Sequence, residues 1–458
     1  MASPKNCCLI QDSKPVETFT ANGLMGEGGG EGLSHALIES QFAHHQKGIA
    51  RLNNGSFGSS PARVLVAQAE WQQLWLQQPD EFYFGPLERG LVASRMAVAS
   101  LINACDVGEV CLLDNATTAA AMVAQDVAWA FTESRYSKGD LILLLSITYA
   151  AVKKAFQAYA VRAGAKILEV EILLPVHSDA EVMASFQEAF QKARNRGKTI
   201  RLAVLDHVTS MPSVVLPIVE LVKLCREEGV ETVFVDGAHA IGNVEINVQE
   251  IDADYYTSNL HKWFFAPTAA CFLHCKAEHL DRLHHPVISH NYGKGLIQEC
   301  AWVGTKDYSP LLAVTAAFDF IVEFVGGVEV LRNHNHKAVV EMGEMLASAW
   351  GTECGTTSDL CSAMMMVALP SKLNIQSHED GLRLRDKLRT HFFVEVPIYF
   401  QEKENPLAQR RSTASGTSVL RSRAYVRISF QIYNKPDDYY KLRDAVKLLA
   451  NKEGGATL

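Results

Sequence analysis

An aspartate and a lysine in neighbouring segments are the residues whose types and setting point most directly to chemistry. Asp236 ends the apolar run 233–235, and Lys262 follows in the next segment, between His261 and Trp263. A buried strand that ends in a carboxylate, followed by a lysine on the next loop, matches what pyridoxal phosphate requires. The lysine amine condenses with the aldehyde, and the carboxylate keeps the pyridine nitrogen protonated so that the ring accepts electrons. The alternative is a surface lysine and a helix-capping aspartate, which either residue alone would favour.

Two further segments have residue types suited to contact a small ligand. Residues 114–119, Asp-Asn-Ala-Thr-Thr-Ala, predict a helix N-terminus with free backbone N–H groups. Thr117 and Thr118 add hydroxyl donors there, so the segment can bind an anion, although Thr117 as a simple N-cap is the other possibility. Residues 53–58, Asn-Asn-Gly-Ser-Phe-Gly, predict either an ordinary turn or one whose backbone approaches a ligand closely.

These residues lie at the ends of alternating apolar runs and amphipathic segments. The predicted strands are 141–145, 165–172, 201–205 and 232–235, and the helices between and beside them are 150–163, 178–196 and 216–228. The alternation predicts an α/β fold with a mostly parallel sheet and helices on both faces. Ligands of such sheets bind beyond the carboxyl ends of the strands. Three of these ends carry Tyr149, Ser210 and His239, which we therefore expect in one crevice.

The chain length of 458 residues exceeds the usual size of one domain and predicts two. We expect a disordered segment at 1–34, an N-terminal arm and large cofactor-binding domain at 35–310, and a smaller α/β domain at 311–458. Within the smaller domain, the polar residues 401–423 predict a mobile loop before a strand that carries Arg427. An arginine on a strand is either solvated or a fork for a substrate carboxylate.

Charge and hydropathy exclude several classes of protein. The formal net charge of −8 argues against a nucleic-acid-binding surface. The longest apolar run, 311–325, is interrupted by Asp319 and Glu323, so we expect a buried helix and no membrane span. The first 30 residues lack the features of a secretion signal or a transit peptide, which predicts a cytoplasmic location without excluding import into an organelle.

The ten cysteines are scattered along the chain, which predicts reduced thiols in a reducing compartment. Cys271, His274 and Cys275 have types that bind metal ions. They lie in an apolar run without a second pair of ligands, so a buried strand is the better interpretation and no metal site is expected.

Together these motifs resemble the class V aminotransferase family of pyridoxal phosphate enzymes, which includes cysteine desulfurases and isopenicillin N epimerase. Asp-x-x-His at 236–239 followed by His-Lys-Trp at 261–263 is the most specific part of the likeness, which extends over roughly residues 35–450. More narrowly, 53–58, 114–118 and 259–263 are similar to the plant L-cysteine desulfhydrase branch. The resemblance implies a fold-type I enzyme that is a homodimer and acts on L-cysteine.

The resemblance also implies a role for each matching residue. Lys262 would attach the cofactor and later move a proton, Asp236 would pair with the ring nitrogen, and His239 would approach the phenolic oxygen. Tyr149 would stack on the ring, and Arg427 would grip the substrate carboxylate. The implied phosphate contacts are Thr117, Thr118, His261 and Asn259, with Gly304 and Thr305 reaching across from the neighbouring subunit, and the further implied substrate contacts are Asn54 and Ser210.

One departure from the family separates the candidate reactions. Cysteine desulfurases carry a nucleophilic cysteine on the loop before this arginine, whereas residues 401–423 contain none and the last cysteine is Cys361. We therefore predict α,β-elimination of L-cysteine to hydrogen sulfide, pyruvate and ammonia, with desulfurase chemistry as an alternative. An epimerase shares the first steps but needs a second acid on the opposite face of the substrate. A non-enzymatic scaffold is the third possibility, and intact Lys262, Asp236 and Arg427 count against it.

Overall fold

The computed structural model describes residues 35–403, 405 and 423–452. The segment 1–34 that we predict to be disordered, and most of the predicted loop 401–423, lie outside the described residues. The described chain begins with three short elements, α1 (His35–Gln41), β1 (Ala50–Arg51) and α2 (Asn54–Phe57).

The larger of the two main sheets has seven strands in the order β2-β8-β7-β6-β5-β3-β4. Its strands from β7 to β4 are all parallel, whereas β8 runs antiparallel to both of its neighbours. The bounds are β2 (Val110–Leu113), β3 (Leu141–Leu145), β4 (Lys166–Val170), β5 (Ile200–Asp206), β6 (Thr232–Asp236), β7 (Tyr255–Asn259) and β8 (Cys271–Cys275). Every residue of β3, β6 and β7 is buried, as in parallel strands covered on both faces. The prediction of an α/β fold with a mostly parallel sheet is confirmed, and so is the strand at Cys271–Cys275.

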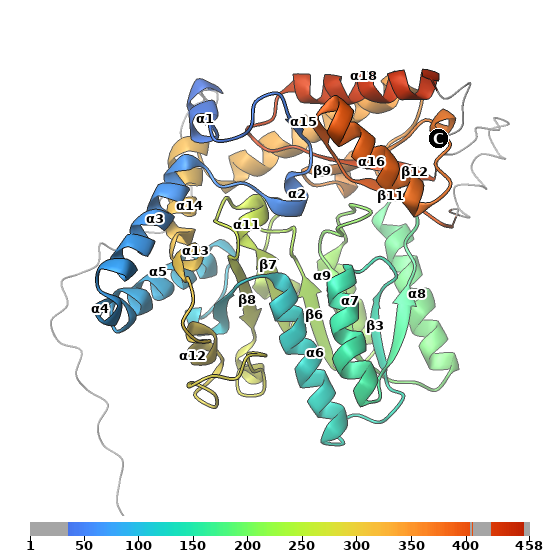
Figure 1. Ribbon diagram of the computed structural model, residues 1–458. Coiled ribbons are helices and arrows are strands. Elements are labelled where there is room, and N and C mark those ends of the chain that lie inside the picture. The colour runs from blue at the N-terminus through green and yellow to red at the C-terminus, as the bar shows by residue number, and fades with distance from the viewer. Residues whose placement is uncertain (1–34, 404, 406–422, 453–458) are drawn as a thin grey trace, which may run out of the picture.

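Helices cover both faces of this sheet (Figure 1). One face packs against α6 (Ala116–Thr132), α7 (Ala150–Phe156) and α12 (Leu296–Ala301). The other face packs against α5 (Pro86–Leu101), α8 (Asp179–Asn195), α9 (Ile218–Glu227) and α10 (Val248–Ile251). The helix predicted at 150–163 forms as α7, but it continues as a π-helical turn over Gln157–Val161.

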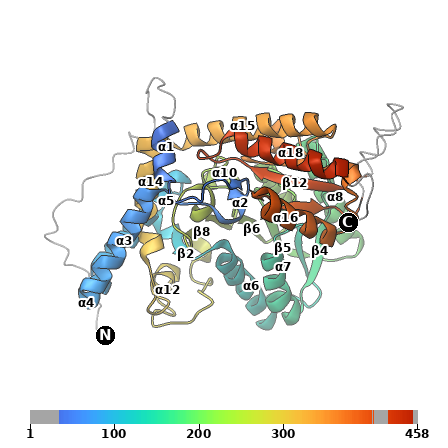
Figure 2. The same ribbon diagram turned by 45° about the horizontal axis from the view of Figure 1, so that its top comes forward.

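A smaller sheet of three antiparallel strands lies above the carboxyl ends of the large sheet in Figure 1. Its order is β11 (Ile398–Phe400), β12 (Ala424–Ser429) and β9 (Met364–Ala368). The helices α15 (Val328–Trp350), α16 (His378–Phe392) and α18 (Pro436–Lys452) pack on it, and Figure 2 shows α15 and α18 side by side. The early strand β1 pairs in parallel with β10 (Val394–Glu395), so the first part of the chain joins this region.

The helices around residue 311, the predicted domain boundary, pack beside the large sheet. The helices α3 (Ala62–Gln77), α4 (Pro79–Tyr83), α13 (Ser309–Leu312) and α14 (Val314–Phe320) form a group with α5 beside β2. Leu311 and Phe320 therefore belong to the core of the large sheet. The core of the small sheet contains Val339 and residues beyond it, together with Ala50 and Leu52 from the beginning of the chain. The domain division at 311 stays a prediction.

Within residues 35–403, 405 and 423–452, no single helix is long and apolar enough to cross a membrane. The segments Ser309–Val325 and Val328–Trp350 reach that length and composition only when taken together, and they are bent by 69° relative to each other.

The N-terminus of α8 is bonded differently from the capping box that its sequence matches. The spacing of Ser178 and Glu181 matches a capping box, in which each side chain bonds the other residue's backbone N–H. Instead, the carboxylate of Glu181 accepts from the backbone N–H of His177, one residue earlier (3.2 Å). Ser178 still occupies the N-cap position, so the predicted start of the helix holds although its bonding does not.

Candidate active site

A cavity of about 160 Å³ lies beyond the carboxyl ends of β5, β6 and β7. Eight of the predicted site residues line it: Thr117, Tyr149, Ser210, Asp236, His239, Asn259, His261 and Lys262. The other described lining residues are Ser56, Asn115, Ala116, Val152, Asp206, Val208 and Ala238. The predicted residues Asn54, Thr118, Gly304, Thr305 and Arg427 lie outside this lining.

Lys262 stands on α11 (Leu260–Trp263), a single helical turn that directly follows β7. Its Nζ lies 3.1 Å from Nε2 of His239. Burial lowers the pKa of Lys262 to about 8, although the charge of Asp236 acts in the opposite direction. The amine is therefore far closer to its uncharged, nucleophilic form than an exposed lysine would be at the same pH.

The turn 53–58 supports this helical turn from the other side. A β-carbon on Gly58 would lie 1.8 Å from the carbonyl oxygen of His261, and Gly58 has a φ of +69°, so no larger residue fits. The amide of Asn54 donates to the carbonyl of Lys262 (3.0 Å) and accepts from the hydroxyl of Tyr433 (2.8 Å). The glycine-rich turn therefore packs closely against the backbone of His261 and Lys262 and holds it in place. A direct substrate contact by Asn54 stays a prediction.

Asp236 is the last residue of β6 and is almost completely buried. Burial raises the pKa of its carboxyl group, and the backbone N–H of Ala238 (3.0 Å) and the charge of Lys262 act against that rise. The next position, 237, requires a glycine, because a β-carbon there would lie 2.5 Å from the hydroxyl oxygen of Tyr256. The carboxylate is thereby held in a nearly dry site, where its interaction with a positive group is strong.

The protonation of His239 follows from its two neighbours. Burial, and next the charge of Lys262, hold the pKa of His239 well below its usual value, so the ring is neutral. The indole N–H of Trp263 donates to Nδ1 (3.4 Å), which leaves the single ring proton on Nε2. That proton points at Nζ of Lys262 and favours the uncharged amine as its acceptor.

The N-terminus of α6 forms another wall of the cavity. Asn115 is the N-cap, because its Oδ1 accepts from the backbone N–H of Thr118 (3.0 Å), and the possibility of Thr117 as the cap is wrong. Oδ1 of Asn259 accepts from the backbone N–H of Ala116 (2.9 Å) and so ties the helix start to β7. Thr117 is exposed into the cavity, whereas the hydroxyl of Thr118 donates to Asn115 (3.3 Å). A helix start of this kind suits an anion.

His261 lines the cavity next to this helix start. Its Nδ1 donates to the carbonyl of Ala270 (2.9 Å), and this bond fixes the orientation of the ring. Burial lowers the pKa of His261 to about 4. Nε2 is therefore the nitrogen that remains for a ligand, and a bound phosphate would favour its protonation.

Arg427 lies on β12 behind the cavity and is almost completely buried. Its guanidinium donates to the carbonyl of Ser210 (2.8 Å), to Oδ1 of Asn53 (2.9 Å) and to Oγ of Ser56 (2.9 Å). Burial lowers the pKa of Arg427 to about 10, so it remains charged at neutral pH. Among the described residues its Nε has no hydrogen-bond partner. A buried cation with neutral partners and a free donor is suited to bind a carboxylate.

Tyr149 lines the cavity, whereas the loop of Gly304 and Thr305 lies near the start of α6. Tyr149 is the N-cap residue of α7 and is 50% exposed. Lys306 follows Thr305 and forms an ion pair with Asp114 (2.6 Å), just before α6. The loop is thereby anchored near the start of α6, and its reach into another subunit stays a prediction.

Sequence reasoning assigned no role in the site to four residues that the structure brings there. Asn53 and Ser56 hold Arg427, Trp263 orients His239, and Asp206 lines the cavity beside Asp236. Asp206 has a signal in the sequence, because it ends a predicted strand in the same way as Asp236. The other three depend on how distant segments meet, which residue spacing does not reveal.

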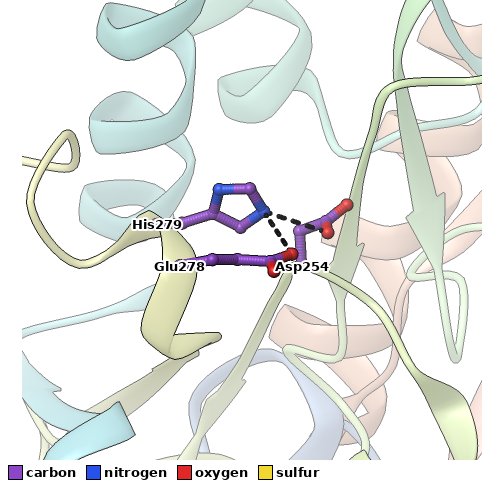
Figure 3. A group of neighbouring side chains, drawn as sticks. All are labelled: Asp254, Glu278 and His279. Carbon is purple, nitrogen blue, oxygen red and sulfur yellow. Dashed lines mark hydrogen bonds and ion pairs between the residues drawn. The ribbon is translucent and has the colours of Figure 1, made fainter.

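A second group of ionisable side chains, Asp254, Glu278 and His279, lies away from the cavity (Figure 3). Nε2 of His279 lies 3.1 Å from Asp254 and 3.5 Å from Glu278. Asp254 also accepts from Arg226 (2.9 Å) and from the backbone of β6, and bonds from His279 and this backbone lower its pKa although burial acts against them. Because Arg226 already neutralises Asp254, the group is best explained as an ion-pair network that joins loops below the sheet.

Comparison with known proteins identifies the class to which this site belongs. A family model described as aminotransferase class-V matches residues 87–442, so the chain belongs to this family, as the motifs predict. It is 52% identical to the putative L-cysteine desulfhydrase 1 of Oryza sativa subsp. japonica, over 92% of this chain and 87% of the relative. It is 50% identical to the L-cysteine desulfhydrase of Arabidopsis thaliana, over 92% of each.

The comparison with solved structures supports the same fold. The structure described as a complex between the cystine C-S lyase C-DES and its product cysteine persulfide matches with a TM-score of 0.65. The match covers 88% of this chain and 98% of that chain at 19% identity, so it concerns the fold alone.

Proposed function

We propose that this chain is a pyridoxal phosphate-dependent L-cysteine desulfhydrase. It converts L-cysteine and water to hydrogen sulfide, pyruvate and ammonia. The observation that carries the proposal is one cavity that joins Lys262, whose pKa burial lowers to about 8, to the buried Asp236, with the guanidinium of Arg427 behind Ser56 and Ser210. Similarity to the two plant desulfhydrases supports L-cysteine as the substrate.

The residues present fit pyridoxal phosphate by their chemistry. Lys262 has the amine that the cofactor's aldehyde requires, and Asp236 has the buried carboxylate that its ring nitrogen requires. The start of α6 with Thr117, together with Nε2 of His261, would hold the phosphate. When bound, the cofactor supplies an electron-accepting ring that stabilises negative charge on the α-carbon of an amino acid.

The side chains of this protein then bind the substrate and move protons. Arg427 would hold the substrate carboxylate through its free donor, and this contact fixes which bond of the α-carbon faces Lys262. The uncharged Nζ of Lys262 would remove the α-proton. The thiolate then leaves the β-carbon and takes up a proton as hydrogen sulfide, and water converts the remaining fragment to pyruvate and ammonia. Tyr149 would cover the exposed side.

The positions and pKa values of the described cysteines argue against the alternative, a cysteine desulfurase. None of the described residues that line the cavity is a cysteine. Burial raises the pKa of Cys361 to about 12 and that of Cys354 to about 11, so both thiols are poor nucleophiles at neutral pH. An epimerase would need, in addition, a second acid on the far face of the substrate.

We also propose that the enzyme is a homodimer in the cytoplasm, with import into an organelle left open. Apolar side chains lie exposed on the helices beside β2, among them Leu76 (67%), Phe84 (87%) and Met96 (56%). Such a patch favours contact with a second copy. The loop of Gly304 and Thr305 would then contact the phosphate of the partner subunit.

The test is to incubate the purified holoenzyme separately with L-cysteine, D-cysteine and L-cystine, and to measure sulfide, pyruvate, alanine and both enantiomers of cysteine together. Sulfide and pyruvate in equal amounts from L-cysteine are the expected result. Alanine without pyruvate would identify a desulfurase. Formation of D-cysteine without sulfide would identify an epimerase. No turnover of any of the three substrates would favour a non-enzymatic scaffold protein.

A further inference from the structure

A second buried carboxyl group lies beside Asp236 in the cavity. Asp206 is the last residue of β5, and it is the register partner of Asp236 on the adjacent parallel strand. Partners on neighbouring strands lie roughly 5 Å apart. Both side chains line the cavity, and each is only 3% exposed. Two carboxylates that close, away from water, repel each other too strongly for both to be charged.

The surroundings decide which of the two carries the charge. The carboxylate of Asp236 accepts from the backbone N–H of Ala238 (3.0 Å) and is attracted by Lys262. The hydroxyl of Thr148 accepts from the backbone N–H of Leu145 (3.1 Å) and donates its own proton to Asp206 (3.1 Å). Asp236 therefore has an N–H donor and a cation to stabilise its anion, whereas Asp206 has one hydroxyl.

We propose that Asp206 is a positioning residue that acts through Asp236: the two carboxyl groups share one proton, and Asp206 holds it. The pair then carries a single negative charge, and that charge faces Lys262. The proposal deepens the proposed function, because it concerns the residue that would hold the cofactor's ring nitrogen.

The other titratable groups around the pair leave this distribution unchanged. Burial raises the pKa of Asp206 well above its usual value, and the charge of Asp236 raises it further. His207, next to Asp206, has its pKa lowered to about 4 by burial, and the pKa of Tyr256 on β7 is raised, so both are neutral at pH 7. Lys262 is the cation that acts on Asp236.

The shared proton has a consequence for the lysine. The charge of Asp236 raises the pKa of Lys262, and burial outweighs it. A second negative charge at Asp206 would raise that pKa further and keep the amine protonated. The neutral Asp206 therefore helps to keep Lys262 a nucleophile.

The proton on Asp206 is measured directly by infrared spectroscopy of the purified protein with its cofactor. At pH 7 ordinary carboxyl groups are ionised, so a protonated one shows as a separate carbonyl stretch. We expect a band in the wild type that Asp206→Asn removes. Asp236→Asn should lower the pH midpoint of the Asp206 band by ~1 unit or more, because the repelling charge is gone. Thr148→Val should raise the midpoint, because a donor to the carboxylate is lost.

Two outcomes would overturn the proposal: a band that survives in Asp206→Asn, or a midpoint that is the same in wild type and Asp236→Asn. A purely structural role for Asp206 predicts the second outcome. The Asp236 and Thr148 variants keep the test decisive if Asp206→Asn does not fold, because Asp206 is intact in both. Sulfide release is measured separately. If the enzyme releases no sulfide but Asp236→Asn still lowers the pH midpoint of the Asp206 band, the proposed function is wrong and the shared proton is still supported.

Discussion

The two ends of the cavity are built in opposite ways. The lysine end comes from one continuous stretch, 232–263, which contains β6, β7 and α11. The arginine end joins three distant segments, with Asn53 and Ser56 from the early turn, Ser210 after β5, and Arg427 on β12. One end is therefore local in the sequence, and the other exists only after the chain has folded.

The two ends also differ in how their charges respond to pH. At the lysine end, burial lowers the pKa of Lys262 to about 8 and keeps His239 neutral, so the lysine gains and loses its proton at accessible pH. At the arginine end, Arg427 stays charged and its partners are neutral. Changes at the lysine end should therefore alter the rate and its pH dependence, whereas changes at the arginine end should mainly alter substrate binding.

The largest effect should come from Lys262→Ala. Turnover and the covalent, borohydride-trappable attachment of the cofactor should both disappear, because no other described amine lines the cavity. Some cofactor should remain bound through its phosphate. Lys223→Ala, which changes an exposed lysine on α9, is the control and should behave as wild type. A trappable adduct in Lys262→Ala would show that another lysine is the attachment site.

Asp236→Asn should have the next largest effect at this end. A neutral amide cannot keep a ring nitrogen protonated, so we expect a loss of at least ~3 kcal/mol in transition-state stabilisation. Steady-state kinetics with L-cysteine measure this loss, and circular dichroism checks that the variant is folded. Near-normal turnover would remove Asp236 from the mechanism.

At the arginine end, Arg427→Lys should raise KM for L-cysteine about tenfold to a hundredfold, because a lysine keeps the charge but lacks the free Nε donor and the planar fork that holds it in place. Its kcat should change much less. Ser56→Ala is a milder variant of the same interaction, since it removes one partner of the guanidinium. We expect a cost of about 1 kcal/mol there. A change in kcat with an unchanged KM would contradict the comparison between the two ends.

This contrast also explains how much could be predicted from the sequence. The strand at Leu141–Leu145 and the strand that ends in Asp236 match the apolar runs, because parallel strands buried on both faces show few polar residues. Eight predicted site residues share the cavity because most of them follow the carboxyl ends of strands, and these ends meet at one edge of the sheet. The contacts of Arg427 with Asn53 and Ser56 could not be predicted, because they depend on how the small sheet docks on the large one. The packing of 309–325 with α3 and α5 escaped prediction for the same reason.

Trp263→Phe sharpens the picture of the lysine end. In wild type, capture of added pyridoxal phosphate by cofactor-free protein should rise with pH, with a midpoint near pH 8, as Lys262 loses its proton. Phenylalanine cannot donate to Nδ1 of His239, so the ring proton can move there and Nε2 can accept from a charged amine. This change stabilises the protonated lysine and should move the midpoint to higher pH by up to ~1 unit. Borohydride trapping at a series of pH values measures the midpoint, and an unchanged value would contradict the assigned tautomer.

The smallest effects should come from the cysteines nearest in sequence to Arg427. Both Cys354 and Cys361 have a raised pKa, and neither lines the cavity. Single changes to serine should leave sulfide release within a few-fold of wild type, with small losses from packing, because buried cysteine behaves as a small apolar residue. A desulfurase predicts the opposite, since one of these changes would abolish turnover. Mass spectrometry of the enzyme quenched during turnover decides between the two reactions. One extra sulfur atom on a single cysteine, a gain of ~32 Da per chain, would mark a persulfide formed by a reactive thiolate and would replace the lyase assignment.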